Sequence, residues 1–237
     1  MIIECCDLHK EYMADNSVVA AVQDVNLSIE QGDFVVILGH SGSGKTTLLS
    51  LIGGLTIPDR GIVRINGIEN WHQSDEDLSD MRNSTIGFVF QFASLIPTLT
   101  ALENVLLPLS FGKHPRGDHQ RALEILEMVG LKDKANAFPS QLSGGQQRRV
   151  AIARAFVNQP DIILADEPTG DLDEDTEQDI LNIFRKYNEQ GMTFVVVTHN
   201  IHLARTQKNA KVLEMRQGVL GDRIIVPAEK IDISEMV

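Results

Sequence analysis

The sequence predicts an α/β fold with a mostly parallel sheet and a helical lobe inserted near the middle of the chain. Strand-like and helix-like periods alternate along the 237 residues, as in layered α/β domains. Residues 34–38 (FVVIL) form a continuous apolar run, which is typical of a strand buried on both faces. Residues 95–158 are mainly helical in pattern, so they form the lobe.

The elements before the lobe follow in order. The strand over residues 34–38 leads into a glycine-rich turn and then into a helix over residues 45–52. Residues 62–65 and 86–90 have the apolar character of further strands. We expect a sheet that is mostly parallel, and an antiparallel β subdomain at the N-terminal end.

The lobe and the segment after it show the same alternation. Residues 121–129 place most of their apolar side chains on one side of a helix, and a second helix is expected over residues 146–158. Strand character returns at residues 161–165 and 193–198, with a helix over residues 174–187 between them. We therefore expect a single domain, with a core of residues 1–91 and 160–237 and a lobe of residues 92–159.

The charge balance excludes one class of partner. The chain has 21 Lys and Arg against 33 Asp and Glu, a net charge of −12. Because nucleic-acid backbones are bound through clustered cations, we expect no nucleic-acid partner. No stretch approaches the ~18 consecutive apolar residues of a membrane span, so any action at a membrane requires a partner.

A phosphate-binding loop lies between the first buried strand and its helix. The pattern G-x-x-x-x-G-K-[ST] is complete here. Glycines let the backbone wrap around phosphate oxygens, and the helix N-terminus adds a positive dipole. Lys45 is expected to contact the β- and γ-phosphates, and the Thr46 hydroxyl to bind Mg²⁺. The nucleotide-binding residues are then Gly39, His40, Ser41, Gly42, Ser43, Gly44, Lys45, Thr46 and Thr47. The motif alone does not separate an ATPase from a GTPase, a kinase or a helicase.

Two acidic residues end the strand over residues 161–165. Asp166 is suited to hold Mg²⁺ through water, and Glu167 to polarise the water that attacks the γ-phosphate. Surface caps are the alternative for such a pair. His199 closes the next apolar strand, where open α/β sheets bind ligands, so it is expected to contact the γ-phosphate. A structural or solvent-facing histidine is the alternative.

A second candidate anion site precedes the helix over residues 146–158. Ser143 with Gly144, Gly145 and Gln146 forms an N-cap with flexible backbone beside it. A second phosphate-binding helix end is redundant within one chain, but it is useful if it faces the nucleotide of another copy. The run Leu142–Gln146 (LSGGQ) resembles the signature of ABC ATPases.

This resemblance implies an ABC cassette of the P-loop NTPase class that uses ATP and Mg²⁺. Two copies would pair head to tail, with each ATP between one P-loop and the opposite signature. Glu167, His199, Gln91 and Lys45 would be catalytic. Thr46, Gln91 and Asp166 would hold the metal.

Three further residues resemble family positions. Tyr12 is similar to the aromatic residue that stacks on adenine, although an ordinary tyrosine at a strand end is the alternative. Gln91 resembles the loop glutamine that links ATP to the membrane partner. Asp173 is similar to the residue that communicates across the dimer. Asp171 stands where many relatives have Asn, and Asn200 where an acid often follows the histidine; for Asn200 we expect little consequence.

The segments around residues 87–91 and 99–109 closely resemble the macrolide-exporter and lipoprotein-release subgroup. This resemblance implies a MacB/FtsX-like membrane permease as partner, export or extraction as the task, and a peripheral location at the cytoplasmic face of the membrane. Residues 137–141 lack the Gly-Glu-Arg-Gly pattern of fused multidrug exporters, so the permease is expected to be a separate subunit. Residues 93–109 would be the docking surface, although their apolar side chains are equally suited to the core of the lobe. The alternative function is a non-transporting signalling ATPase similar to the cell-division cassette. A soluble ATPase of DNA repair or translation fits less well, because the chain has one compact cassette.

Overall fold

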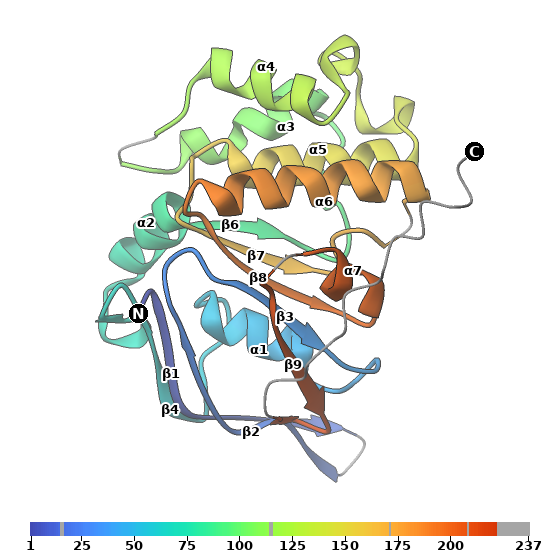
Figure 1. Ribbon diagram of the computed structural model, residues 1–237. Helices are drawn as coiled ribbons and strands as arrows, with labels where there is room; N and C mark the ends of the chain where they lie inside the picture. Colours follow the sequence, from blue (N-terminus) through green and yellow to red (C-terminus); the bar gives the residue numbers. More distant parts are fainter. Residues whose placement is uncertain (15–16, 114–115, 171, 208, 222–237) are drawn as a thin grey trace, which may run out of the picture.

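The computed structural model describes residues 1–14, 17–113, 116–170, 172–207 and 209–221. These residues form two sheets (Figure 1). The larger sheet has the order β10-β9-β3-β8-β7-β6, in which β9, β3, β8, β7 and β6 run parallel and β10 is antiparallel at the edge. Its strands are β3 (Phe34–Leu38), β6 (Ile86–Val89), β7 (Ile162–Asp166), β8 (Thr193–Thr198), β9 (Lys211–Arg216) and β10 (Val219–Leu220). The predicted mostly parallel sheet is confirmed.

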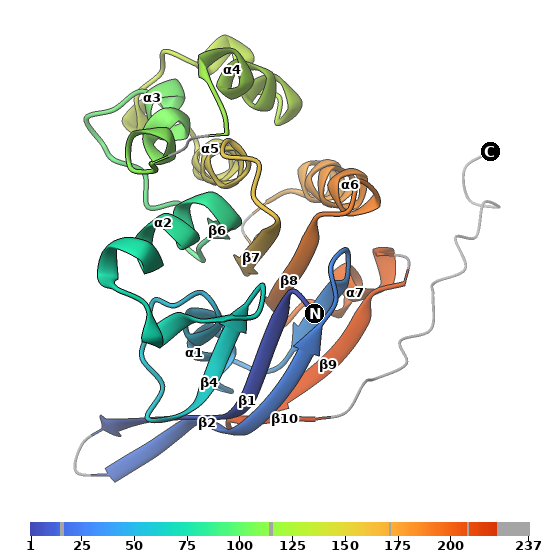
Figure 2. The same ribbon diagram turned by 90° about the vertical axis from the view of Figure 1, so that its left-hand side faces the viewer.

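The smaller sheet is antiparallel and has the order β2-β1-β4-β5. Its strands are β1 (Ile3–Ala14), β2 (Ser17–Ile29), β4 (Arg60–Ile65) and β5 (Ile68–Glu69). The predicted N-terminal antiparallel subdomain is therefore present, and it also recruits strands that follow helix α1 (Lys45–Ile52). Helix α1 packs between the two sheets (Figure 2).

The lobe above the larger sheet is helical, as the sequence predicted. It carries α3 (Ala101–Leu106), α4 (His119–Met128) and α5 (Gly144–Phe156), together with the 3₁₀ turns η2 (Leu107–Ser110), η3 (Lys132–Lys134) and η4 (Pro139–Gln141). The remaining helical elements are α2 (Asp75–Thr85), α6 (Glu174–Glu189), α7 (Ile201–Thr206) and the turn η1 (Asn70–His72).

Helix α2 was missed in the sequence because its apolar periodicity is weak. Leu78 and Thr85 are its buried residues, so few apolar side chains mark a face. The helix start is nevertheless specified locally, since the Ser74 hydroxyl accepts a hydrogen bond from the Asp77 backbone N–H at 3.2 Å. Capping rather than periodicity was the available signal.

The two faces of β3 enter different hydrophobic clusters. Val35 and Ile37 pack with α1 and the antiparallel sheet, whereas Phe34 and Val36 pack with α5 and α6. This alternation follows from the two-residue period of a strand. On the second face, the Phe34 and Phe194 rings stack at 5.1 Å, which joins adjacent strands. Burial on both faces holds the strands rigidly.

The strand ends bring distant loops together. Strands β3 and β8 pair through Leu38 and Thr198, and β7 and β8 pair through Asp166 and Val197. Because these strands are parallel, the loops that follow them leave the sheet at the same edge.

Candidate functional site

The loop between β3 and α1 forms a close backbone cradle. Gly44 has φ 103°, a left-handed conformation that favours glycine, and a Cβ there would collide with the Ala21 carbonyl oxygen. Gly39 is similarly enclosed, because a Cβ would lie 2.6 Å from the Ser43 hydroxyl. Helix α1 begins at Lys45 without a side-chain cap. Its first backbone N–H groups thus face the cradle without a capping side chain.

Lys45 closes the cradle. The residue is only 7% exposed, and its ammonium donates hydrogen bonds to the carbonyl oxygens of Gly39 at 2.7 Å and His40 at 3.0 Å. The hydroxyl of Ser43 is buried beside it without a hydrogen-bond partner. A buried unsatisfied hydroxyl and a confined cation are suited to phosphate oxygens, which accept hydrogen bonds from both.

Asp166 sits at the end of β7 against the cradle. Its carboxylate accepts a hydrogen bond from the Thr46 hydroxyl at 2.7 Å. Burial raises the pKa of Asp166, and the charge of Glu167 adds to the increase, while the Thr46 hydrogen bond and the nearby Lys45 oppose it. The carboxylate is therefore partly desolvated next to a hydroxyl group.

This oxygen pair fits a hard cation. Mg²⁺ is commonly held by one or two protein oxygens, with water and phosphate oxygens completing the shell. Within the described residues, no cluster of three or more His, Cys, Asp or Glu side chains could hold a metal alone. The Thr46 and Asp166 oxygens thus match a metal that shares its ligands with a bound triphosphate.

Glu167 is held by the loop after β8. Its φ of 46° places a non-glycine residue in the left-handed region, as occurs at functional sites. The Glu167 carboxylate accepts hydrogen bonds from the Thr198 hydroxyl at 2.7 Å and from the His199 backbone N–H at 3.0 Å. The Nδ1 atom of His199 lies 2.9 Å from the same carboxylate, while the imidazole is 73% exposed. Glu167 and His199 therefore form one unit beside the cradle.

These groups surround a cavity of about 600 Å³. Its lining includes most of the predicted residues: His40, Ser41, Gly42, Ser43, Gly44, Lys45, Thr46, Thr47, Gln91, Asp166, Glu167 and His199. The sequence did not indicate Ala21, Phe92, Arg148 or Gly170, which also line the cavity. Arg148 is 6% exposed and donates to the Phe90 carbonyl at 2.8 Å, which ties α5 to the Gln91 loop. The only sequence signal for Arg148 is its position shortly after the signature run.

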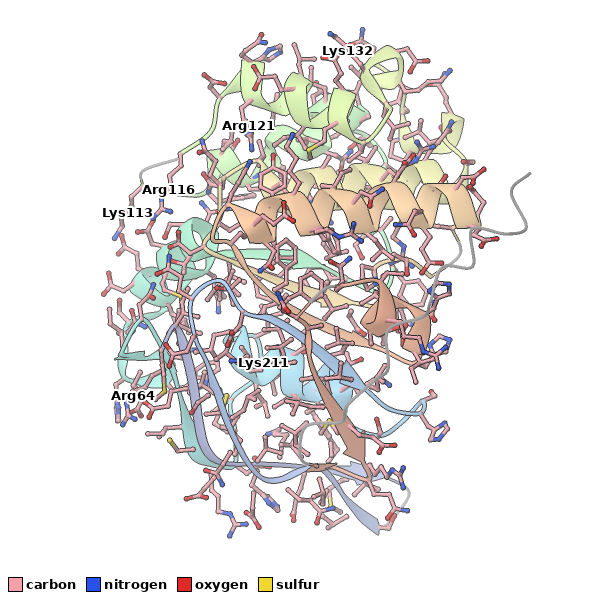
Figure 3. All side chains as sticks on the ribbon, viewed as in Figure 1. Arg64, Lys113, Arg116, Arg121, Lys132 and Lys211 are labelled. Atoms are coloured by element: carbon pink, nitrogen blue, oxygen red, sulfur yellow. The ribbon has the colours of Figure 1, made fainter. Side chains whose placement is uncertain are left out.

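One lysine, Lys45, and one arginine, Arg148, are among the described residues that line the cavity. Other cations, including Lys113, Arg116 and Lys132, lie elsewhere and pair with nearby carboxylates (Figure 3). Lys45 and Arg148 thus supply positive charge to a polyanion bound in this cavity.

The signature run lies apart from this cavity. Ser143 is the N-cap of α5: its hydroxyl accepts from the Gln146 N–H at 3.2 Å, and the Gln146 side chain accepts from the Ser143 N–H at 2.9 Å. Ser143 and Gly144 are exposed. None of the residues from Ser143 to Gln146 is among the described residues lining the cavity.

Gly39, although part of the cradle, and the predicted residues Tyr12 and Asp173 also lie outside the cavity lining. Tyr12 is in β1 and 45% exposed, with the Lys10 ammonium 5.6 Å from its ring centre. Asp173 is the N-cap of α6 and accepts from the Thr176 N–H at 3.0 Å, which lowers the pKa of Asp173. Asp171 lies outside the described residues.

A second, apolar cavity of about 320 Å³ opens between the sheet edge and the lobe. The Phe88 and Phe90 rings, stacked at 5.5 Å, line it together with Leu107, Phe111 and Arg154. Phe111 is 73% exposed. We call this cavity the lobe groove.

The predicted docking segment, residues 93–109, divides between groove and core. Ser94, Leu107 and Pro108 line the groove, whereas Ala101 and Val105 are fully buried in the lobe. No helix in the described part of the chain is long and apolar enough to cross a bilayer.

Comparisons with known proteins show the family to which the chain belongs. Residues 22–170 match the family described as "ABC transporter". An uncharacterized ABC transporter ATP-binding protein of Thermotoga maritima is 47% identical over 218 residues, which cover 92% of each chain. The macrolide export ATP-binding/permease protein MacB of Aggregatibacter actinomycetemcomitans is 43% identical over 92% of this chain but only 34% of its own length.

A solved structure shares the fold throughout. It is the dimeric post-hydrolysis state of the ATP-binding cassette MJ0796, bound to ADP and Pi. The TM-score is 0.88 at 43% identity, and the match covers 96% of this chain and 100% of the other. The chain belongs to the ABC transporter family, as an ATP-hydrolysing ATP-binding cassette.

Proposed function

We propose that two copies of this chain pair head to tail and drive a separate membrane permease that exports or extracts its substrate. One observation carries the pairing. The cradle, Asp166, Glu167, His199 and Gln91 share one cavity, whereas the signature helix end is exposed away from it. A second copy would bring its signature to the open side of the cavity. The MJ0796 cassette, similar over its full length, is described as a dimer.

Each cavity residue has a role that its position supports. Lys45 and the N-terminus of α1 hold the β- and γ-phosphates. Mg²⁺, held through Thr46 and Asp166 with Gln91 nearby, would neutralise phosphate charge. Glu167 accepts a proton from the attacking water, the His199 backbone N–H holds the Glu167 carboxylate, and the exposed His199 imidazole donates toward the γ-phosphate.

Two peripheral residues complete the proposed nucleotide site. The exposed ring of Tyr12 is available to stack on adenine. Asp173 caps α6 at the end of the loop that follows Glu167, so it is placed to carry contacts between the two copies. The role of Tyr12 requires bound ATP, and the role of Asp173 requires the ATP-bound pair.

The lobe groove is the proposed docking surface for the permease. Its apolar lining and the exposed Phe111 suit an inserted segment of a membrane subunit. Phe90 lines the groove and Gln91, its neighbour in sequence, lines the nucleotide cavity. Docking would place the chain at the cytoplasmic face of the membrane. Identification of the membrane subunit that co-purifies with this chain separates a transport role from mechanical signalling.

The test of the pairing is Glu167→Gln. The amide keeps the shape of the side chain but cannot accept the proton, so we expect hydrolysis to fall by about 100-fold or more while ATP binding is retained. Size-exclusion chromatography with light scattering should then show an ATP-dependent dimer. Glu174→Gln, on the exposed first turn of α6, is the matched control. Hydrolysis at the wild-type rate, or a monomer with ATP bound, would contradict the proposal.

A further inference from the structure

Asn200 and Glu177 connect the two loops that carry the proposed catalytic groups. One carboxylate oxygen of Glu177, in the first turn of α6, accepts hydrogen bonds from two sources. The Thr169 hydroxyl donates to it at 3.0 Å, and the Asn200 side-chain amide donates at 3.2 Å. Thr169 follows Glu167 in the loop after β7, and Asn200 follows His199 in the loop after β8.

The orientation of the Asn200 amide is fixed by the backbone. Asn200 is the N-cap of α7, and its side-chain oxygen accepts from the His202 N–H at 2.9 Å. An N–H group can only donate, so the oxygen must face α7. The amide nitrogen is therefore the atom that faces Glu177.

The connection continues to the proposed base. The Asn200 backbone N–H donates to the Thr198 hydroxyl at 3.0 Å, and that hydroxyl donates to the Glu167 carboxylate at 2.7 Å. On the other side, the Gly170 N–H donates to the Glu167 carbonyl at 3.2 Å, next to Thr169. Glu177 thus anchors both loops that surround Glu167.

We infer that Asn200 and Glu177 are a matched pair of positioning residues, which fix the His199 loop relative to Glu167 through an amide-to-carboxylate hydrogen bond. This inference rests on the catalytic roles proposed for Glu167 and His199. It differs from the small consequence that the sequence suggested for Asn200. The pair touches no reacting atom, so it acts on the rate of hydrolysis through geometry and leaves the phosphate cradle unchanged.

Asn200→Asp isolates this hydrogen bond. One oxygen of the new carboxylate can still cap α7, so the helix start is retained. The other oxygen stands where the Asn200 amide N–H donated to Glu177, and it is a negatively charged acceptor. It faces the Glu177 carboxylate at hydrogen-bonding distance, so the two negative charges repel. The substitution therefore disturbs the link and spares the cap.

The experiment compares steady-state ATP hydrolysis of Asn200→Asp, Glu177→Gln and the double variant. For Asn200→Asp we expect kcat to fall about tenfold with KM for ATP unchanged, as for a lost charge-assisted hydrogen bond that positions a reacting group. Glu177→Gln alone should remain near wild type, because its amide oxygen still accepts from Asn200. In the double variant the new amide at position 177 donates to the new carboxylate at position 200, so kcat should recover.

The matched control is Asn182→Asp, the same chemical change on the exposed face of α6, where the side-chain oxygen accepts a hydrogen bond from the Gln178 amide at 3.2 Å. It should leave kcat unchanged. If Asn200→Asp does not fold, Glu177→Ala removes the shared acceptor without adding charge and should lower kcat in the same way.

Three outcomes would overturn the pairing of Asn200 with Glu177: a wild-type kcat for Asn200→Asp, a loss that the second substitution does not restore, or a change confined to KM. The proposed function fails differently, through a Glu167→Gln variant that hydrolyses ATP normally. The two failures are therefore distinguishable.

Discussion

Two glycine-flanked helix N-termini in the described part of the chain are suited to anions, and they differ in what surrounds them. At α1 the end is uncapped by side chains, Lys45 is buried beside it, and a cavity of about 600 Å³ opens in front of it. At α5 the end is satisfied by a reciprocal pair of hydrogen bonds between Ser143 and Gln146. Ser143 is also exposed to solvent.

The difference indicates which half of a site each helix end supplies. The N-terminus of α1 has its cation, its hydroxyl groups and its acids within one chain. The N-terminus of α5 has the Ser143 hydroxyl as its cap and lies outside the lining of that cavity, and its capping box keeps it stable without a ligand. In the proposed pair, α1 supplies the phosphate-binding half of each site, and the N-terminus of α5 supplies the half that comes from the other copy.

The largest expected effect is at the α1 end. Lys45→Ala removes the buried cation that faces the phosphates, so ATP affinity measured by titration calorimetry should fall about 1000-fold. The control is Lys186→Ala, an exposed lysine on α6. Retention of micromolar ATP binding by Lys45→Ala would remove the basis for treating α1 as the phosphate site.

Ser143→Arg tests the α5 end. Because Ser143 lies outside the cavity of its own chain, the variant should bind ATP normally, yet its hydrolysis should fall by roughly 100-fold through the loss of partner contacts to the γ-phosphate. An equal mixture with Lys45→Ala sharpens the test. Each mixed pair then contains one intact site, built from the wild-type Lys45 of one copy and the wild-type Ser143 of the other.

Recovery of hydrolysis in that mixture above the sum of the two inactive variants is the expected result. If the mixture stays inactive although mixed pairs form, the two helix ends do not belong to one shared site.

The smallest expected effect concerns stability. Burial raises the folded pKa of Asp166 above its unfolded value, so the ionised carboxylate lowers stability at neutral pH. Asp166→Asn, which still accepts from Thr46, should raise Tm at pH 7 by about 2 °C or more while impairing hydrolysis. As pH falls through the raised pKa of Asp166, the wild-type carboxylate gains a proton. The difference in Tm between the variant and wild type should therefore disappear. A lower Tm for the variant at pH 7 would contradict this.

The cradle was predictable because its function depends on local backbone conformation. Gly44 must adopt a positive φ directly before α1, so the requirement appears as a short pattern in sequence. Strands β3 and β8 and helix α1 have the predicted bounds for the same reason, since continuous apolar runs flanked by turn residues mark them.

Arg148 and α2 were not predictable in this way. Arg148 enters the cavity lining because α5 packs against the Gln91 loop, a contact between segments that are far apart in the chain. The sparse apolar positions of α2 become a buried face only against neighbouring elements. Neither Arg148 nor α2 is marked in the sequence by a hydrophobic period or by a motif with fixed spacing.

By itself the sequence determined the class of this protein and the alternation of strands and helices, and it supplied the predictions of the phosphate loop and the acidic pair. Each of these depends on residues that are neighbours in the chain. Tertiary structure alone decided that Glu167 is held by Thr198 and His199, that Glu177 joins Thr169 to Asn200, and that the Ser143 helix end lies apart from the cavity. Parallel strand pairing sets these relations, because it places loops separated by tens of residues within hydrogen-bonding distance at one sheet edge.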